Sequence, residues 1–408
     1  MKYWKHLIAI ITLLSLVLGT GLTPVLAEQE PNIAAEAAVV MELNSGQVVW
    51  SKNENATRAP ASTTKILTAL LALEKGNLQD QVTISEDAVR VEGTRVYLVA
   101  GETQTLENLL YAMLLNSAND AAYAIAEHIG GSIEGFARMM NEKARELGAV
   151  NTNFVNPNGL SEENHYTTAL DLALIARAAM ENPTFREIVA TQNRPWTGAE
   201  WSSTLINGNK LLASYEGTIG VKTGYTREAG WCLVSAAERN GETFLAVVLG
   251  SNNNQVWSDS TALLNYGFNN YYTQTLAQVG QVVGQLEIDK QQLDIAVNGD
   301  LTFLQSKSNP TYPAQKIHID PLKAPLEKGS KIGEIKYTVD GKEIGKLDLV
   351  AHNSIERHIT LWEGWSVLAT GIILLLFLIV VLRFIVRKRS RRYSYGSYGR
   401  LRRYQSFN

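Results

Sequence analysis

The chain contains Ser62-Thr63-Thr64-Lys65, Ser117-Ala118-Asn119 and Lys222-Thr223-Gly224, once each and in that order. Together these segments supply a hydroxyl nucleophile, an amine that can take its proton, a second hydroxyl beside an amide, and a cation on a β-strand. An acyl-enzyme mechanism that acts on a small peptide ending in a carboxylate needs this set of groups. The ordered set of three segments, and no single one of them, predicts this chemistry.

Ser62 and Lys65 lie in the first turn of a predicted helix that follows Pro60. Residues at i and i+3 share a helix face, so the Lys65 amine can reach the Ser62 hydroxyl. Lysine acts as a base only when it is neutral, and its ordinary pKa is about 10.4. Burial and a second cation, for which Lys222 is the candidate, would lower that pKa. The alternative is that Ser62 is only a helix N-cap.

Ser117 and Asn119 lie at a break between two helical patterns, at residues 105–116 and 119–129. Either side chain can be a simple helix cap. In the functional interpretation, the Ser117 hydroxyl relays a proton to the leaving amine, while the Asn119 amide holds Lys65 and the substrate backbone.

Lys222, Thr223 and Gly224 fall on a predicted strand. As an edge strand it could pair with an extended peptide. Gly224 would let the peptide backbone approach closely, and Lys222 and the Thr223 hydroxyl would face the terminal carboxylate. On its own, such a tripeptide is an ordinary exposed turn.

The predicted fold class is α+β, with an antiparallel sheet flanked by a helical block. Alternating residues at 38–51 indicate a hairpin, and residues 217–250 indicate three more strands. Helical patterns cover roughly residues 105–116, 119–129, 133–147 and 168–181. We expect a first domain at residues 33–272. Short β-like runs predict a small all-β domain at residues 273–358, which we interpret as a spacer or docking platform.

The two ends of the chain indicate export and membrane attachment. Residues 1–27 have the basic start, apolar run and small-residue cleavage point of a signal peptide, with an uncleaved anchor as the alternative. Residues 365–386 form an apolar stretch long enough to cross a bilayer, uncharged as far as Leu382 and with Arg383 near its end. Residues 387–408 form a basic tail, which predicts a single-pass protein whose tail is cytoplasmic and whose larger part lies outside the cell.

The charge of the chain is divided between its parts. The formal net charge is −3. Without the nine Lys and Arg after Leu382 and the two in the signal peptide, 26 basic residues oppose 40 acidic ones, a net charge of −14 for the exported part. This excludes nucleic acid as an expected partner. Cys232 is the only cysteine and lies in an apolar stretch, so we expect a buried inert thiol, and no metal site or cofactor.

The chain resembles the serine-type D-Ala-D-Ala carboxypeptidases, the low-molecular-mass penicillin-binding proteins, over roughly residues 33–358. The three motifs and their spacing carry the resemblance. Further similar segments are Asn156-Pro157-Asn158-Gly159-Leu160, His165-Tyr166-Thr167-Thr168-Ala169, Asn209-Lys210-Leu211-Leu212 and Ala324-Pro325-Leu326-Glu327-Lys328-Gly329. The resemblance implies a penicillin-binding/β-lactamase-like transpeptidase fold. The substrates implied are peptidoglycan stem peptides ending in D-Ala-D-Ala, with β-lactam antibiotics as acylating inhibitors.

The same resemblance implies roles for individual residues. Ser62 would be acylated, Lys65 would accept its proton, and Ser117 would assist proton transfer. Asn119 would orient Lys65 and the substrate. The remaining implied residues are Lys222, Thr223 and Gly224 for substrate binding, and the backbone N–H groups of Ser62 and Tyr225 for the oxyanion hole.

The chain departs from the family pattern at two places. Tyr225 stands where some relatives have histidine. The loop at residues 251–257 lacks the arginine that helps some relatives hold the carboxylate. Either Arg227 replaces that arginine, or carboxylate binding depends on Lys222 and Thr223 alone.

Three other functions compete with the carboxypeptidase. A β-lactamase is disfavoured because no Glu-x-x-x-Asn segment follows Ser117 at the corresponding place. An endopeptidase that cuts cross-links would use the same residues. A catalytically silent wall-binding scaffold would not need so specific a set of reactive residues as Ser62, Lys65, Ser117 and Lys222. His165 and Asp171 also form a tempting catalytic pair, but we interpret both as structural.

Overall fold

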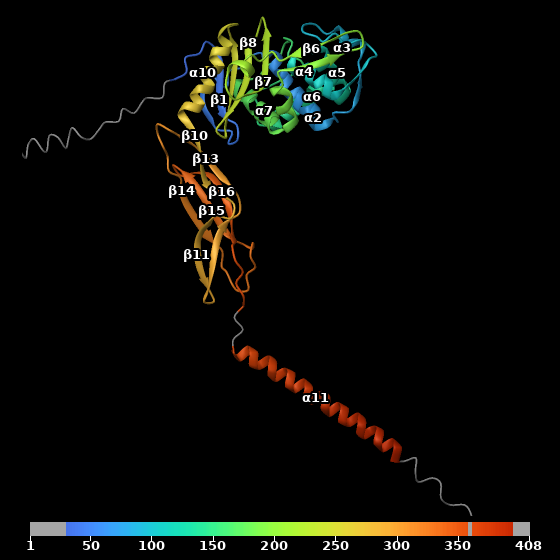
Figure 1. Ribbon diagram of the computed structural model, residues 1–408, viewed down its shortest axis with the longest axis vertical. Coiled ribbons are helices and arrows are strands. Elements are labelled where there is room, and N and C mark those ends of the chain that lie inside the picture. Colours follow the sequence, from blue (N-terminus) through green and yellow to red (C-terminus); the bar gives the residue numbers. More distant parts are fainter. Residues whose placement is uncertain (1–29, 358–360, 395–408) are drawn as a thin grey trace, which may run out of the picture. The chain divides into compact units, whose positions relative to one another are not determined.

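The structure is a computed structural model that describes residues 30–357 and 361–394. The predicted signal peptide, residues 1–27, lies outside the described residues, as does the end of the basic tail from residue 395. The chain divides into two compact units (Figure 1). The first unit ends at Leu276 but also includes Thr302–Tyr312, a segment within the range predicted as β domain.

A five-stranded antiparallel sheet forms the centre of the first unit, in the order β2-β1-β9-β8-β7. Its strands are β1 (Ala37–Glu42), β2 (Val48–Lys52), β7 (Thr218–Thr226), β8 (Gly230–Arg239) and β9 (Glu242–Ser251). Side chains alternate between the two faces of a strand. Val39 and Met41 of β1 therefore enter one hydrophobic core, while Ala38 and Val40 enter a second core on the opposite face.

The first core lies between the sheet and a block of helices, which Figure 1 shows on one side of the sheet. Its principal elements are η1 (Ala61–Thr64), α2 (Lys65–Lys75), α4 (Leu106–Leu115), α5 (Asn119–Gly130), α6 (Ile133–Glu146), α7 (Ala169–Glu181) and α8 (Pro183–Ala190). Side-chain caps begin several of them; Thr168, for example, accepts a hydrogen bond from the backbone of Asp171. The predicted helical block is confirmed.

Helix α10 (Gln255–Asn270) covers the second core and is absent from the sequence-based expectations. Its apolar residues Val256, Leu263, Leu264 and Phe268 do have helical spacing and pack against the sheet. The pattern is obscured because Asp259, also on the buried side, is charged. The Asp259 carboxylate accepts hydrogen bonds from the backbone of Ala34 and Ala35 and from the Ser251 hydroxyl. The two backbone partners are more than 200 residues away in the sequence, so the sequence pattern does not reveal them.

Small elements complete the first unit. They are α3 (Glu86–Arg90), α9 (Leu211–Ser214), the strand pair β3 (Gln81–Thr83) with β4 (Thr103–Thr105), the pair β5 (Asn193–Thr197) with β6 (Ser202–Ile206), and the pair β10 (Tyr271–Ala277) with β13 (Leu301–Ser306). None of these was expected from the sequence, because each is short and depends on its neighbours for burial.

The second unit contains a five-stranded antiparallel sheet in the order β11-β12-β16-β15-β14. Its strands are β11 (Val282–Ile288), β12 (Gln291–Val297), β14 (Ala314–Ile319), β15 (Lys331–Val339) and β16 (Lys342–Ala351). The apolar residues Ile332, Ile335 and Tyr337 of β15 are buried. The predicted all-β unit is confirmed.

Helix α11 (Leu361–Ser394) contains one apolar stretch, Gly364–Lys388, that is long enough to cross a membrane. In the most apolar part of this stretch, no side chain is buried against the rest of the protein. A soluble core helix would bury such side chains, so α11 is a candidate membrane anchor. The predicted span, residues 365–386, lies within it.

Candidate active site

Ser62 lies in the short 3-10 turn η1 that leads into α2. The turn begins with Ala61 at a positive φ of 49°, a conformation that costs a non-glycine residue about 1 kcal/mol. The hydroxyl of Thr64 donates to the Ala61 carbonyl at 2.9 Å and holds this turn. Ser62 caps neither η1 nor α2 with its side chain, so the simple N-cap interpretation is wrong.

The Lys65 amine is buried and lies within hydrogen-bond distance of three oxygens. They are Ser62 Oγ at 3.0 Å, Asn119 Oδ1 at 2.7 Å and the backbone oxygen of Asn158 at 2.6 Å. The last two can only accept. A neutral amine has two hydrogens and one lone pair, so donation to these two oxygens leaves the lone pair for the Ser62 hydroxyl. The contact predicted from the i, i+3 spacing is confirmed.

Both motif lysines have pKa values well below the ordinary value for lysine. Burial is the main cause for Lys65, and the charge of Lys222 lowers its pKa further, while Asp120 opposes the shift. Burial lowers the pKa of Lys222 to about 7. Ammonium groups lose hydration when they are buried, which favours their neutral form. The site therefore meets the condition for a lysine base.

Asn119 connects the second motif to the first. Its Oδ1 accepts from Lys65, and its Nδ2 donates to the Glu92 carbonyl at 2.7 Å, so both ends of the amide are fixed. It does not cap α5, because Ala118 occupies the N-cap position. Ser117 has a positive φ of 60°, which is unusual for serine and often marks functional turns. The helix-cap interpretation of this motif is thus wrong for both side chains.

The third motif lies on β7, which borders the sheet, as expected. Gly224 packs against the turn that carries Ser62: a Cβ added to it would lie 2.9 Å from the Ser62 backbone nitrogen. The sequence suggested that Gly224 leaves room for a peptide, whereas the structure shows that it leaves room for the nucleophile's own turn. This packing brings the backbone of Ser62 next to the strand.

We expect Gly224→Ala to lower the free energy of unfolding by about 1–3 kcal/mol and to slow acylation of Ser62. The added methyl group would meet backbone atoms of Ser62 and Thr63 that cannot rotate away. Gly284→Ala is the matched control, because a Cβ at that strand position has its nearest contact at 3.8 Å. Thermal unfolding and the rate of penicillin labelling measure the two effects. Equal effects of the two substitutions would contradict the tight packing at Gly224.

The sequence did not reveal two polar groups of the site. One is the Asn158 carbonyl, which lies in a loop whose Gly159, at φ 85°, packs directly on the Ala61 carbonyl. The other is the buried carboxylate of Asp120, which accepts from the backbone of Val96 and Leu98. Backbone carbonyls leave no signal in a side-chain pattern. The only available signal was the Asn156-Pro157-Asn158-Gly159 turn itself.

His165 and Asp171 do not form a pair. His165 accepts from the Val155 backbone at its Nδ1, so its Nε2 carries the proton and donates to Thr64 Oγ1. Burial lowers the pKa of His165 to about 4. Asp171 instead accepts from the Thr152 hydroxyl. The structural interpretation of both residues agrees with these contacts.

The turn after β7 contains Arg227, which is exposed. On β7 itself, the exposed ring of Tyr225 packs against Trp231 of β8, with centroids 5.0 Å apart and the ring planes tilted by 35°. In the loop at residues 251–257, the Ser251 hydroxyl donates a hydrogen bond to the Asp259 carboxylate. Arg227 is therefore the cationic residue that directly follows the C-terminal end of β7 in the sequence.

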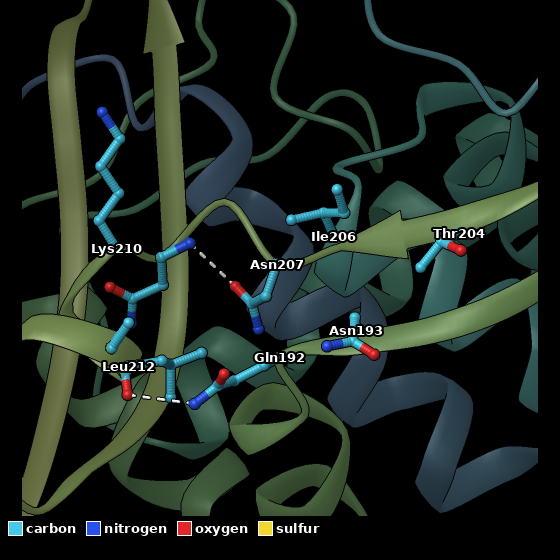
Figure 2. A pocket seen from close by; sticks show the side chains of 9 residues that line it. Gln192, Asn193, Thr204, Ile206, Asn207, Lys210 and Leu212 are labelled. Carbon is cyan, nitrogen blue, oxygen red and sulfur yellow. Dashed lines mark hydrogen bonds between the residues drawn. The ribbon is translucent and has the colours of Figure 1, made fainter.

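A pocket of about 360 Å³ lies between β5, β6 and the start of α9 (Figure 2). Its lining includes Gln192, Thr204 and Asn207 and, among the described residues, none of the three motifs. The Lys210 side chain points away from the other labelled groups (Figure 2). The pocket is thus distinct from the site around Ser62.

Known proteins with this arrangement were found by sequence and by structure. Residues 25–253 match the family described as D-alanyl-D-alanine carboxypeptidase, and residues 271–357 match the C-terminal domain of penicillin-binding protein 5. The D-alanyl-D-alanine carboxypeptidase DacF of Bacillus subtilis is 34% identical over 339 residues, covering 79% of this chain and 86% of the relative. DacA of Haemophilus influenzae is 32% identical over 372 residues, covering 85% and 91%.

The solved structures agree with the sequence matches. Penicillin binding protein 5 from Haemophilus influenzae superposes with a TM-score of 0.67 at 29% identity, covering 80% of this chain and 99% of that one. The predicted fold class and the predicted resemblance are both confirmed. By sequence, by fold and by the order of its motifs, this chain belongs to the D-alanyl-D-alanine carboxypeptidase family.

Proposed function

We propose that this protein is a serine-type D-alanyl-D-alanine carboxypeptidase that removes the terminal D-alanine from peptidoglycan stem peptides and is acylated by penicillin. The observation that carries the proposal is the Lys65 amine, which is buried and bonded to two acceptors and to Ser62 Oγ at 3.0 Å. A hydroxyl becomes a strong nucleophile when an adjacent base takes its proton. Family membership supports the same activity.

The chemistry proceeds in two steps. Ser62 Oγ attacks the carbonyl of the penultimate D-alanine while its proton passes to Lys65, and the backbone N–H groups of Ser62 and Tyr225 stabilise the oxyanion. The C–N bond then breaks as the leaving amine gains a proton through Ser117. In the second step a water molecule attacks the ester, its proton passes to Lys65, and Ser62 regains a proton as the shortened peptide leaves.

Substrate orientation is assigned to the third motif. Lys222 and the Thr223 hydroxyl attract the terminal carboxylate, and Asn119 holds the substrate backbone, whereas Arg227 follows Thr226 at the other end of β7. Because β7 borders the sheet, the peptide can add to it as an antiparallel strand. This orientation places the carboxylate toward Lys222 and the rest of the peptide toward Thr226.

The location follows from the ends of the chain. The apolar stretch of α11 would cross the cell membrane, the basic residues at its C-terminal end and beyond would lie in the cytoplasm, and the catalytic unit would face the wall. Protease digestion of intact cells tests the orientation. Release of the catalytic unit supports it, and complete protection contradicts it.

The KM for such a peptide is expected to rise with pH above about 7. The pKa of Lys222 is about 7, so the ammonium form that attracts a carboxylate is the main form below this pH and is lost above it. The affinity for the peptide then falls by up to about tenfold per pH unit. This fall continues until the pH reaches the pKa that Lys222 has in the substrate complex. KM values between pH 6 and 9 check this. Lys222→Met should give a higher KM that no longer varies over this range.

One experiment separates the competing functions. Full-length protein in detergent is incubated with labelled penicillin and, separately, with a peptide ending in D-Ala-D-Ala and with a cross-linked wall dimer. A long-lived adduct with D-alanine release supports the carboxypeptidase. Cleavage of the dimer alone indicates an endopeptidase, and rapid penicillin turnover indicates a β-lactamase. The absence of any adduct would leave the silent scaffold and contradict the acyl-enzyme.

A further inference from the structure

Glu228 follows β7 in an exposed turn and is held in place by one hydroxyl. Ser161 Oγ lies 2.8 Å from Glu228 Oε2 and 3.0 Å from Thr226 Oγ1. Thr226 Oγ1 also accepts from the Ala229 backbone at 3.0 Å, which tightens the turn. No lysine or arginine lies within ion-pair distance of Glu228 in the described part of the chain. The carboxylate is therefore positioned but has no cationic partner.

We propose that Glu228, positioned by Ser161, binds a terminal ammonium group on the side chain of the residue that precedes the D-Ala-D-Ala dipeptide. This inference rests on the proposed function, because it takes the substrate to lie along β7. It assigns specificity to a residue outside the three motifs.

The first step concerns the face of β7 on which Ser161 and Glu228 lie. Alternate residues of a strand share a face, so Lys222, Gly224 and Thr226 point to the same side. That side is the one occupied by the nucleophile, since a Cβ on Gly224 would touch the Ser62 backbone. Thr226 on this face meets Ser161. The Ser161–Glu228 pair is thus on the nucleophile's side of the strand.

The second step is the register of the peptide. With the scissile carbonyl at the backbone N–H of Tyr225 and the carboxylate toward Lys222, the peptide runs antiparallel to β7. The residue before the scissile D-alanine then lies opposite Thr226. Residues directly opposite in an antiparallel pair have Cβ atoms about 4.5–5.5 Å apart on the same face. An L residue at this position directs its side chain toward Ser161 and Glu228.

The third step is charge. The hydrogen bond from Ser161 is the main cause that lowers the pKa of Glu228, so the carboxylate is ionised at neutral pH. Arg227 is adjacent and also lowers that pKa, but in the described part of the chain it forms no ion pair with Glu228. An ammonium on a flexible four-carbon stem provides three donors for such an acceptor. The charge of a lysine side chain therefore complements that of Glu228.

Two tripeptides that differ in a single charge test the proposal. They are Nα-acetyl-L-lysyl-D-alanyl-D-alanine, with a free ε-amine, and its Nα,Nε-diacetyl form. D-alanine release by the full-length protein gives the ratio of the two kcat/KM values within each variant. We expect a preference of about two- to five-fold for the free amine in the wild type, as for other exposed ion pairs. The ratio should approach unity in Glu228→Gln and reverse in Glu228→Lys.

Glu163→Gln is the matched control, because Glu163 is an exposed acid in the Ser161 loop and its removal changes the net charge equally. It should keep the wild-type ratio. Penicillin labelling of each variant shows that it is folded. A wild-type ratio of one, an unchanged ratio in Glu228→Gln, or an equal loss in Glu163→Gln would overturn the inference. The proposed function would survive each of these results, and it would fail only if neither peptide were cleaved.

Discussion

Replacing Ser62 with alanine is expected to abolish the covalent penicillin adduct and to reduce D-alanine release by at least about 10⁴-fold. The substitution removes only Oγ, which is one of three oxygens around the Lys65 amine. The other two remain, so the amine keeps its place while the atom that would form the ester is gone. Mass spectrometry of the intact protein after incubation with penicillin measures the adduct.

The fold of this variant should be unchanged, because the Ser62 side chain caps neither η1 nor α2. A melting temperature within a few degrees of the wild type shows that the loss is chemical. Ser85→Ala is a useful contrast, since the Ser85 hydroxyl does cap a helix, accepting from the Ala88 backbone. That variant should be destabilised by about 1 kcal/mol and still form the adduct. A persistent adduct in Ser62→Ala would show that another residue is the nucleophile.

The sequence predicts local contacts of the site well, because they follow from fixed spacings. Helix geometry alone places Lys65 near Ser62, and the strand pattern places Lys222, Thr223 and Gly224 together on one strand. The contact between Lys65 and Asn119 spans 54 residues, and only the ordered set of motifs suggests it. The distance of 2.7 Å between Lys65 Nζ and Asn119 Oδ1 agrees with the expectation that this amide holds the lysine.

Other parts of the site depend on the backbone and are invisible in side-chain patterns. The Asn158 carbonyl completes the environment of Lys65, yet any residue has a carbonyl. Gly224 is needed because of the turn that packs on it, which is a property of the tertiary structure. Helix α10 was missed for a related reason: its buried Asp259 is satisfied by backbone groups more than 200 residues away. Burial of a polar group can be predicted only when its partners are known.

Lys65→Met is expected to slow the acylation of Ser62 by about 10³-fold, a typical effect of losing a general base. Methionine has a similar volume and no proton-accepting nitrogen, so packing in the buried site is largely kept. The substitution leaves Asn119 Oδ1 and the Asn158 carbonyl without their shared donor, but it also removes a buried amine. We expect these stability effects to oppose each other. Thermal unfolding measures their sum.

The pH dependence of acylation distinguishes a base from a merely structural lysine. In the wild type the rate should rise with pH as Lys65 loses its proton, over a range below the ordinary pKa of lysine, because burial and Lys222 favour the neutral amine. In Lys65→Met this rise should disappear. Lys75→Met is the control, since Lys75 is an exposed residue in the last turn of the same helix and should leave both the rate and its pH dependence unchanged. If Lys65→Met lowered the rate but kept the wild-type pH profile, another group would be the base, and Lys65 would act only by holding Ser62, Asn119 and the Asn158 loop together.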